Sequence, residues 1–207
     1  MRVIAYIDGF NLYYGCLKDS PFRWLDLVAL TRKLAPGQDI QRVKYFTALV
    51  KDRGGSSGKR FRQQVYLRAL RCNPLVEIHL GRFLTNVVAL PLAGSAPNAP
   101  KLVKVLKTQE KGSDVNLATH LVADALLDRF DSALVVTNDS DLLEAIRTAR
   151  NLAGKRVGIV NPQKRASAAL QNACDFYRPI RANALAACQL PDRLTDGTGS
   201  IHKPAGW

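Results

Sequence analysis

The stretch from Ser132 to Ala145 constrains the fold of this chain more than any other. It reads S-A-L-V-V-T-N-D-S-D-L-L-E-A, with an apolar run at 133–136, a polar turn at 137–141 and a helical pattern directly after it. A short apolar run between polar residues is typical of a buried strand in a parallel sheet. Strand, tight turn and helix together make half of a βαβ unit. Ligands bind such sheets at the carboxyl ends of the strands, which is where Asp139 and Asp141 lie.

Both aspartates also have a purely structural interpretation. Asp and Ser are preferred at helix N-termini, and Asp141 with Glu144 resembles a capping box. Two further acids with the same placement favour a functional role. Asp8 follows an apolar run that predicts the first strand, and Asp114 stands at the start of a helical pattern.

Strand-like and helix-like patterns alternate along the chain, which indicates an α/β fold with a mainly parallel central sheet. We expect strands at residues 2–7, 41–50, 75–84, 133–136, 156–160 and 176–180, and helices at 25–34, 59–70, 113–127, 167–173 and 183–189. Two further strand-like runs, residues 85–90 and 102–108, predict an inserted β-hairpin over about 85–108.

Segments rich in Gly, Ser or Pro predict loops at residues 51–58 and 91–100. From residue 191 to 207 the chain is polar and lacks periodicity, so we expect a flexible C-terminal tail. The sequence contains no internal repeat, and we expect a single domain over residues 1–190.

The charge of the chain points to a polyanionic partner. Its 30 Lys and Arg residues outnumber 17 Asp and Glu residues, which gives a formal net charge of +13. Nucleic acid is the first candidate for so basic a protein, although a solvated basic face is the alternative. The cations concentrate in the middle third of the chain. The candidate nucleic-acid-binding residues are Lys59, Arg60, Arg62, Lys104, Lys107 and Lys111.

The cysteines and the N-terminus bear on the compartment. None of the four cysteines forms a C-x-x-C pair, which disfavours a structural zinc site and suggests reduced thiols in a cytoplasmic protein. The N-terminal apolar run is too short for a signal peptide, and no stretch is long enough to span a membrane. We therefore expect no membrane partner.

The four acids are best explained together. A parallel sheet brings the ends of its strands to one edge, where Asp8, Asp114, Asp139 and Asp141 would repel one another unless a cation neutralised them. Oxygen ligands without His or Cys suit Mg²⁺ or Mn²⁺. Such a metal can activate water for the hydrolysis of a phosphodiester bond.

Three motifs in this order resemble those of the NYN domain family, the LabA-like branch of the PIN-like nucleases. They read V-I-A-Y-I-D-G-F-N-L at 3–12, E-K-G-S-D-V-N-L at 110–117 and A-L-V-V-T-N-D-S-D-L at 133–142, and G-K-R-V-G-I-V at 154–160 is similar to the family's next strand. The resemblance spans about residues 1–180. It implies a three-layer α/β/α PIN-like (Rossmann-like) fold and Mg²⁺- or Mn²⁺-dependent ribonuclease activity on single-stranded or structured RNA. Our first hypothesis is an endoribonuclease, although the sequence leaves endonucleolytic and exonucleolytic cleavage both open.

By motif position, the resemblance implies roles for individual residues. Asp8, Asp114, Asp139 and Asp141 would be catalytic and would bind the metal, and Asn11 would position the substrate or a metal-bound water. The chain departs from the family at His120, where members often carry a further Asp, and at Thr137-Asn138, where many have Ser-Gly. A helical histidine such as His120 is more often buried and hydrogen-bonded than catalytic.

Other functions remain open at this point. The chain can be an RNA-binding regulator that retains the fold and cuts poorly, or a Toprim-like or phosphatase-like metal enzyme. A dinucleotide-binding Rossmann domain is least favoured, because no G-x-G-x-x-G follows a strand. The sequence also leaves open a homodimer, for which the predicted hairpin offers a contact.

Overall fold

The computed structural model describes residues 1–50, 58–93 and 102–207. The predicted loops at 51–58 and 91–100 therefore lie largely outside the described residues. Seven strands of the described chain form one sheet in the order β4-β3-β2-β1-β5-β6-β7, in which only the β3–β4 pair is antiparallel. The strands are β1 (Arg2–Asp8), β2 (Asp39–Ala48), β3 (Val76–Pro91), β4 (Leu102–Lys111), β5 (Ser132–Val136), β6 (Arg156–Asn161) and β7 (Phe176–Pro179).

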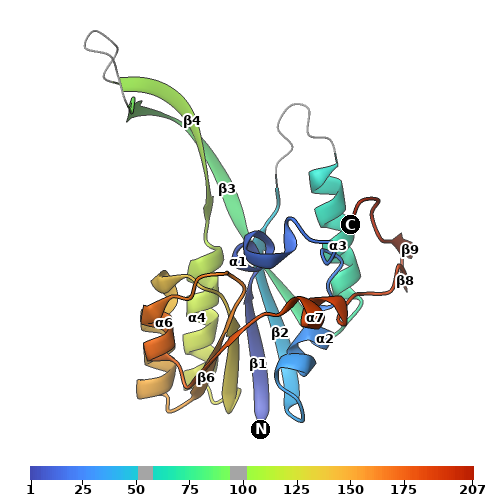
Figure 1. The fold of residues 1–207 in the computed structure, drawn as a ribbon, viewed down its shortest axis with the longest axis vertical. Coiled ribbons are helices and arrows are strands. Elements are labelled where there is room, and N and C mark those ends of the chain that lie inside the picture. The colour runs from blue at the N-terminus through green and yellow to red at the C-terminus, as the bar shows by residue number, and fades with distance from the viewer. Residues whose placement is uncertain (51–57, 94–101) are drawn as a thin grey trace.

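Helices cover both faces of this sheet, which confirms the expected α/β/α fold class (Figure 1). They are α1 (Gly9–Leu12), α2 (Leu27–Leu34), α3 (Lys59–Arg71), α4 (Ser113–Leu126), α5 (Leu143–Arg147), α6 (Ala168–Ala173) and α7 (Ala182–Ala186). Short π-helical turns, Tyr13–Leu17 and Thr148–Leu152, continue α1 and α5, and a 3₁₀ turn, Ser140–Leu142, precedes α5.

The alternation of side chains along β1 explains the two-sided core. Val3, Ala5 and Ile7 pack under α2, α3 and α7, whereas Ile4 and Tyr6 pack under α4, α5 and α6. Every residue of β5 is buried, as expected for a central parallel strand covered on both faces. The central strands are thus fixed by their apolar side chains, and their carboxyl ends all lie at the edge where α1 begins (Figure 1).

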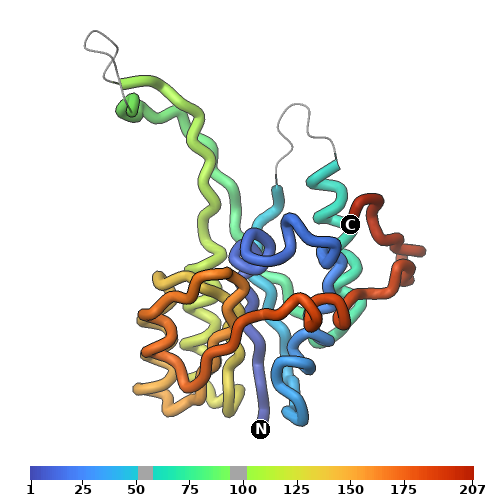
Figure 2. Tube along the Cα trace, viewed as in Figure 1, coloured from blue at the N-terminus to red at the C-terminus, as the bar shows by residue number. Residues whose placement is uncertain are grey.

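Strand β3 differs from its prediction because it is one continuous strand. Its first part, Val76–Gly81, pairs with β2, and Arg82–Pro91 pairs with β4. The sequence predicts two separate strands, at residues 75–84 and 85–90. Gly81 lies inside the continuous strand and permits close packing, because a Cβ there would collide with Oε1 of Glu110 and lie 2.8 Å from the carbonyl oxygen of Lys111. The outer part of β3 and β4 form a two-stranded arm that extends away from the helices (Figure 2).

The prediction of a flexible tail at residues 191–207 is wrong. The segment forms the hairpin β8 (Arg193–Asp196) and β9 (Gly199–His202) and lies beside α3 (Figure 2). Arg68 of α3 binds the carboxylate of Asp196 through two hydrogen bonds of 2.7 and 2.6 Å. The ring of Trp207 packs against the buried ring of Trp24, which itself donates a hydrogen bond to the carbonyl of Pro191. These contacts order a segment whose composition alone suggests disorder.

No helix among the described residues is long and apolar enough to cross a membrane. All four cysteines are free thiols.

Candidate metal and substrate site

Asp8 and Thr137 emerge next to each other because β1 and β5 are parallel neighbours in register. Ile7 pairs with Val136, so the next residue of each strand reaches the same edge of the sheet. The side chain of Asp8 is 2% exposed. One carboxylate oxygen accepts a 2.9 Å hydrogen bond from the backbone N–H of Asn11, and the other accepts bonds from Asn11 Nδ2 at 2.7 Å and Thr137 Oγ1 at 3.1 Å.

The hydroxyl of Thr137 links the first acid to the third. It donates its proton to Asp8 and accepts the backbone N–H of Asp139 at 3.1 Å. The carboxylate of Asp139 in turn accepts the N–H of Asp141 at 3.0 Å and caps the 3₁₀ turn. The alternative capping box of Asp141 with Glu144 does not form, because Leu142 precedes α5 without a side-chain cap and Glu144 pairs with Arg147.

Asp114 reaches the same edge from the first turn of α4. The turn before it uses Gly112 in the left-handed region, at φ 103°. Gly112 is the N-cap, so neither Ser113 nor Asp114 has that role. Instead, Glu110 at the end of β4 accepts the N–H of Ser113 at 3.1 Å and its hydroxyl at 2.7 Å. The helix start, and with it Asp114, is therefore held by the antiparallel arm.

The acids are close enough to influence one another's ionisation. Burial raises the pKa of Asp114 to about 6, and the charges of Asp8, Asp139, Glu110 and Asp141 add to the rise. Burial also raises the pKa of Asp8, although its bonds to Asn11 and Thr137 oppose the shift. The structure thus brings the four predicted carboxylates to one region, while their roles stay a prediction.

The donor set fits a magnesium-like ion in an open site. Among the described residues, no group of three or more His, Cys, Asp or Glu side chains is placed to hold a metal ion. Mg²⁺ does not need one, because it usually keeps several waters and binds through one or two carboxylates and a substrate phosphate. In the described part of the chain, the carboxylates of Asp114 and Asp141 accept no hydrogen bond, so their oxygens are available to a cation.

Asn11 connects the acids to the loop after β6. Its Oδ1 accepts the N–H of Asn138 at 3.3 Å and Nε2 of Gln163 at 3.4 Å, while its Nδ2 binds Asp8. Thr137, Gln163 and Glu110 also belong to the site, although none of them is among the residues predicted for it. Thr137 and Glu110 lie within the motifs that resemble the family, so their position could have indicated a role in the site. Gln163 lies outside these motifs, and no sequence pattern indicated it.

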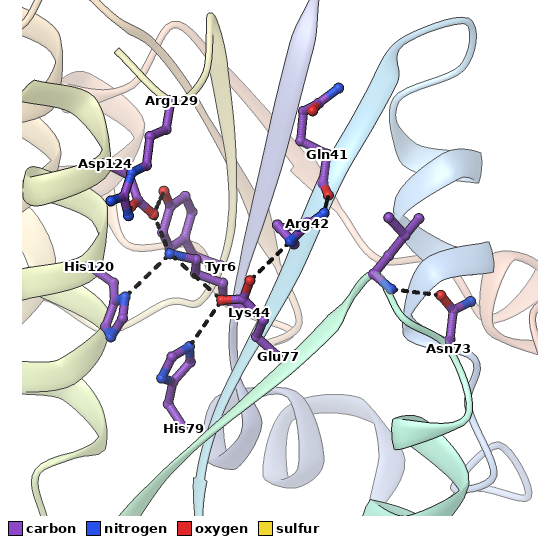
Figure 3. Close-up of polar contacts among 11 residues, drawn as sticks. Tyr6, Gln41, Arg42, Lys44, Asn73, Glu77, His79, His120, Asp124 and Arg129 are labelled. Atoms are coloured by element: carbon purple, nitrogen blue, oxygen red, sulfur yellow. Dashed lines mark hydrogen bonds and ion pairs between the residues drawn. The ribbon is translucent and has the colours of Figure 1, made fainter. Parts of the chain in front are cut away.

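A second polar cluster lies deeper along α4 (Figure 3). Asp124, with its side chain 1% exposed, accepts hydrogen bonds from Lys44 at 2.5 Å, Tyr6 at 2.7 Å and Arg129 at 2.9 Å. Nδ1 of His120 lies 3.3 Å from Nζ of Lys44, and burial lowers the pKa of this imidazole. His120 is therefore a partly buried histidine of a structural network, as the alternative interpretation predicts.

The predicted nucleic-acid-binding residues form two groups. Lys59, Arg60 and Arg62 lie at the start of α3, whereas Lys104, Lys107 and Lys111 lie on β4. The two elements stand on either side of α1, at the end of the molecule that holds the acids (Figure 1). All of these side chains are exposed except that of Arg62, which is partly buried.

The sheet order, the helices on both faces and the acids at the strand ends define a PIN-like α/β/α domain. The profile of the NYN domain matches residues 2–181, and the chain belongs to this family. It is 32% identical, over 237 aligned positions, to 6-hydroxy-3-succinoylpyridine 3-monooxygenase HspA of Pseudomonas putida, with all of this chain and 75% of that protein covered.

The fold also has a counterpart among solved structures. A protein of unknown function from Vibrio parahaemolyticus superposes with a TM-score of 0.54 at 16% identity, over 91% of this chain and 96% of that one. At this identity the likeness concerns the fold alone.

Proposed function

We propose that this protein is a Mg²⁺- or Mn²⁺-dependent endoribonuclease that hydrolyses RNA phosphodiester bonds at the acid cluster. The observation that carries the proposal is Asp114, a half-buried carboxylate without a hydrogen-bond donor in the described structure. Its pKa is raised first by burial and then by the charges of three neighbouring aspartates and Glu110. Such an arrangement is costly for a folded protein unless a cation occupies it. The NYN family assignment supports the same class of activity.

Each acid has its own part in the proposed reaction. Asp114, Asp139 and Asp141 would hold the metal, with Asp8 at the buried side of the site. Mg²⁺ or Mn²⁺ bound there would supply an activated water and offset charge on the scissile phosphate. Asn11 and Thr137 keep the Asp8 carboxylate in one orientation through their hydrogen bonds. The cations of α3 and β4 would attract the RNA, and the free thiols are in keeping with a cytoplasmic setting.

The test uses labelled linear and circular RNA with Mn²⁺, with EDTA, and with the variant Asp139→Asn. We expect cleavage with Mn²⁺ to fall at least ~100-fold in EDTA and in the variant, while Asp192→Asn, an exposed control, cuts normally. Linearisation of the circle identifies endonucleolytic cleavage. Cleavage that survives both EDTA and Asp139→Asn contradicts the proposal. Salt-sensitive binding without turnover under any metal supports the alternative of an RNA-binding regulator.

A second candidate function comes from the Pseudomonas relative, whose similarity covers the whole of this chain. That protein is named as a monooxygenase of a hydroxypyridine. A monooxygenase reaction consumes O₂ and two electrons, so it is tested by O₂ uptake with 6-hydroxy-3-succinoylpyridine and NADH as the electron donor. Substrate-dependent uptake, together with absence of RNA cleavage, would favour this candidate over the nuclease.

A further inference from the structure

A pocket of about 460 Å³ opens beside the acid cluster, and the proposed catalysis does not use it. It lies between α1 with its π-helical turn, the end of β2, and α3. Its lining is mainly aromatic and cationic. The aromatic lining includes Tyr13, Tyr14, Tyr45, Tyr66 and Trp207, and the lining cations in the described part of the chain are Lys18, Arg23, Lys59 and Arg62.

The inner aromatic wall is held in place by packing and hydrogen bonds. The hydroxyl of Tyr66 donates a 2.8 Å hydrogen bond to the carbonyl of Leu25. The ring of Trp207 lies 5.6 Å from that of Tyr66 and 6.2 Å from that of Trp24. The buried rings of Tyr66 and Trp24 thus fix the partly exposed ring of Trp207, which offers a stacking surface without a large loss of side-chain entropy on binding.

The outer rim is open to solvent. Tyr14 is 63% exposed and packs edge-on against Tyr13, with ring centroids 5.2 Å apart. Nζ of Lys18 lies 5.7 Å from the centre of the Tyr14 ring. An exposed aromatic ring beside flexible cations suits a ligand that combines a flat ring with a negative charge. Asp19 is the one acid among the lining residues that the structure describes.

The pocket and the acids are separated only by the first turn of α1. Gly9 and Phe10, which line the pocket, directly follow Asp8. A Cβ on Gly9 would lie 2.7 Å from the carbonyl oxygen of Phe46 and 2.8 Å from the Tyr45 ring, so the glycine permits this close approach. An RNA strand that crosses α1 would therefore run from the pocket to the carboxylates.

We propose that this pocket binds one nucleotide of the RNA, with its base on the aromatic wall and its phosphate on the Lys and Arg side chains, next to the phosphate that is cut. The proposal rests on the proposed ribonuclease function, because it names how that site holds its substrate. Stacking tolerates every base, so the pocket would fix the position of the strand rather than select a sequence.

Intrinsic tryptophan fluorescence reports on binding, since Trp207 lines this pocket and packs against the buried ring of Trp24, the other tryptophan of the chain. The full chain is titrated with adenosine monophosphate, uridine monophosphate, adenosine, ribose 5-phosphate and 6-hydroxynicotinate. We expect both mononucleotides to bind at least ~10-fold more tightly than adenosine or ribose 5-phosphate, because base and phosphate use different walls.

Matched variants assign the binding to the pocket. Tyr14→Ala and Arg62→Ala should each weaken mononucleotide binding about 5- to 100-fold, whereas Tyr14→Phe keeps the stacking ring and should bind normally. Phe61→Ala, an exposed aromatic of α3 that does not line the pocket, is the control. In RNA cleavage, Tyr14→Ala should raise KM and leave kcat nearly unchanged.

The outcomes separate this inference from the nuclease proposal. If Tyr14→Ala and Arg62→Ala leave nucleotide binding unchanged, the nucleotide does not bind in this pocket, and the inference is contradicted even if the protein cuts RNA. Binding of 6-hydroxynicotinate without binding of mononucleotides also overturns it and favours a small aromatic acid as the ligand. Binding with the expected variant pattern, but without RNA cleavage under any metal, supports the nucleotide pocket and contradicts the nuclease.

Discussion

At the scale of single residues, Asp114 couples stability to pH. The folded state raises its pKa from 3.8 to about 6, so the folded state binds more protons than the unfolded state between these values. Its stabilising contribution is therefore complete below pH 3.8 and is lost as the pH rises through about 6. A shift of this size corresponds to ~3 kcal/mol, which solvent screening of this half-exposed group reduces to about 1 kcal/mol.

We predict that Asp114→Asn raises the free energy of unfolding by about 1 kcal/mol at pH 7.5 and leaves it nearly unchanged at pH 4.5. The measurement is urea unfolding in EDTA at several pH values, with Asp192→Asn as the exposed control. If the difference in unfolding free energy between the wild type and Asp114→Asn stayed the same across this pH range, the pKa of Asp114 would not be raised in the folded state.

Asp124 gives a second prediction at this scale. Its buried carboxylate is the direct partner of the buried ammonium of Lys44. Asp124→Asn leaves that ammonium without its main counter-charge, and we expect a loss of about 3–5 kcal/mol in unfolding free energy. Asp128→Asn, whose side chain is 70% exposed and pairs with Arg2 and Lys155, should cost less than ~1 kcal/mol. Equal losses, measured by urea unfolding, would contradict a structural role for the buried cluster.

At the scale of elements, sequence patterns located the central strands well because these are apolar on both faces. The predicted strands at residues 2–7, 133–136 and 156–160 each differ from β1, β5 and β6 by no more than one residue at either end. The same rule about strand ends placed Asp8 and Asp139 at one edge of the sheet. Local patterns suffice here because burial on both faces leaves a continuous apolar run.

The features that the sequence did not reveal depend on contacts between distant residues. Trp207 is ordered by Trp24, and Asp196 by Arg68, yet neither partner is marked by spacing or composition. Glu110 is an exception, because its partner Ser113 is only three residues away; here a pattern of residue types does not specify which N–H and hydroxyl the carboxylate accepts. The pocket likewise arises only once α3 lies beside the end of β2.

Gly81 permits the close packing of β3 against the end of β4, and its substitution tests that packing. A methyl group there would collide with Glu110, which holds the start of α4, and with the backbone of Lys111. We expect Gly81→Ala to destabilise the protein by about 1–3 kcal/mol and to weaken Mn²⁺ binding through displacement of Asp114. Gly197→Ala is the control, because a Cβ at Gly197 meets nothing within 4 Å. Calorimetry of unfolding and of Mn²⁺ binding checks both effects, and an unperturbed Gly81→Ala protein would contradict them.

At the scale of the whole molecule, two groups of cations flank the acid edge, one on the β3–β4 arm and one on α3. If both contact RNA, each lysine contributes to the salt dependence of binding. We predict that the double variant Lys104→Gln, Lys107→Gln makes the negative slope of the logarithm of the RNA association constant against log salt shallower by about 1.4 for single-stranded RNA. Arg32→Gln, Lys33→Gln, two exposed cations of α2, should leave it unchanged. Fluorescence anisotropy at several salt concentrations provides the slope.

The unbroken course of β3 has a mechanical consequence. Its inner residues belong to the central sheet, and its outer residues carry the arm, so no loop separates the two. The paired strands connect the outer part of the arm to Gly81 and Glu110. Glu110 in turn contacts the first turn of α4. We therefore expect that a molecule bound at the outer end of the paired residues Arg82–Pro91, roughly 30 Å from Gly81 at about 3.3 Å per residue, shifts the first turn of α4 and with it Asp114.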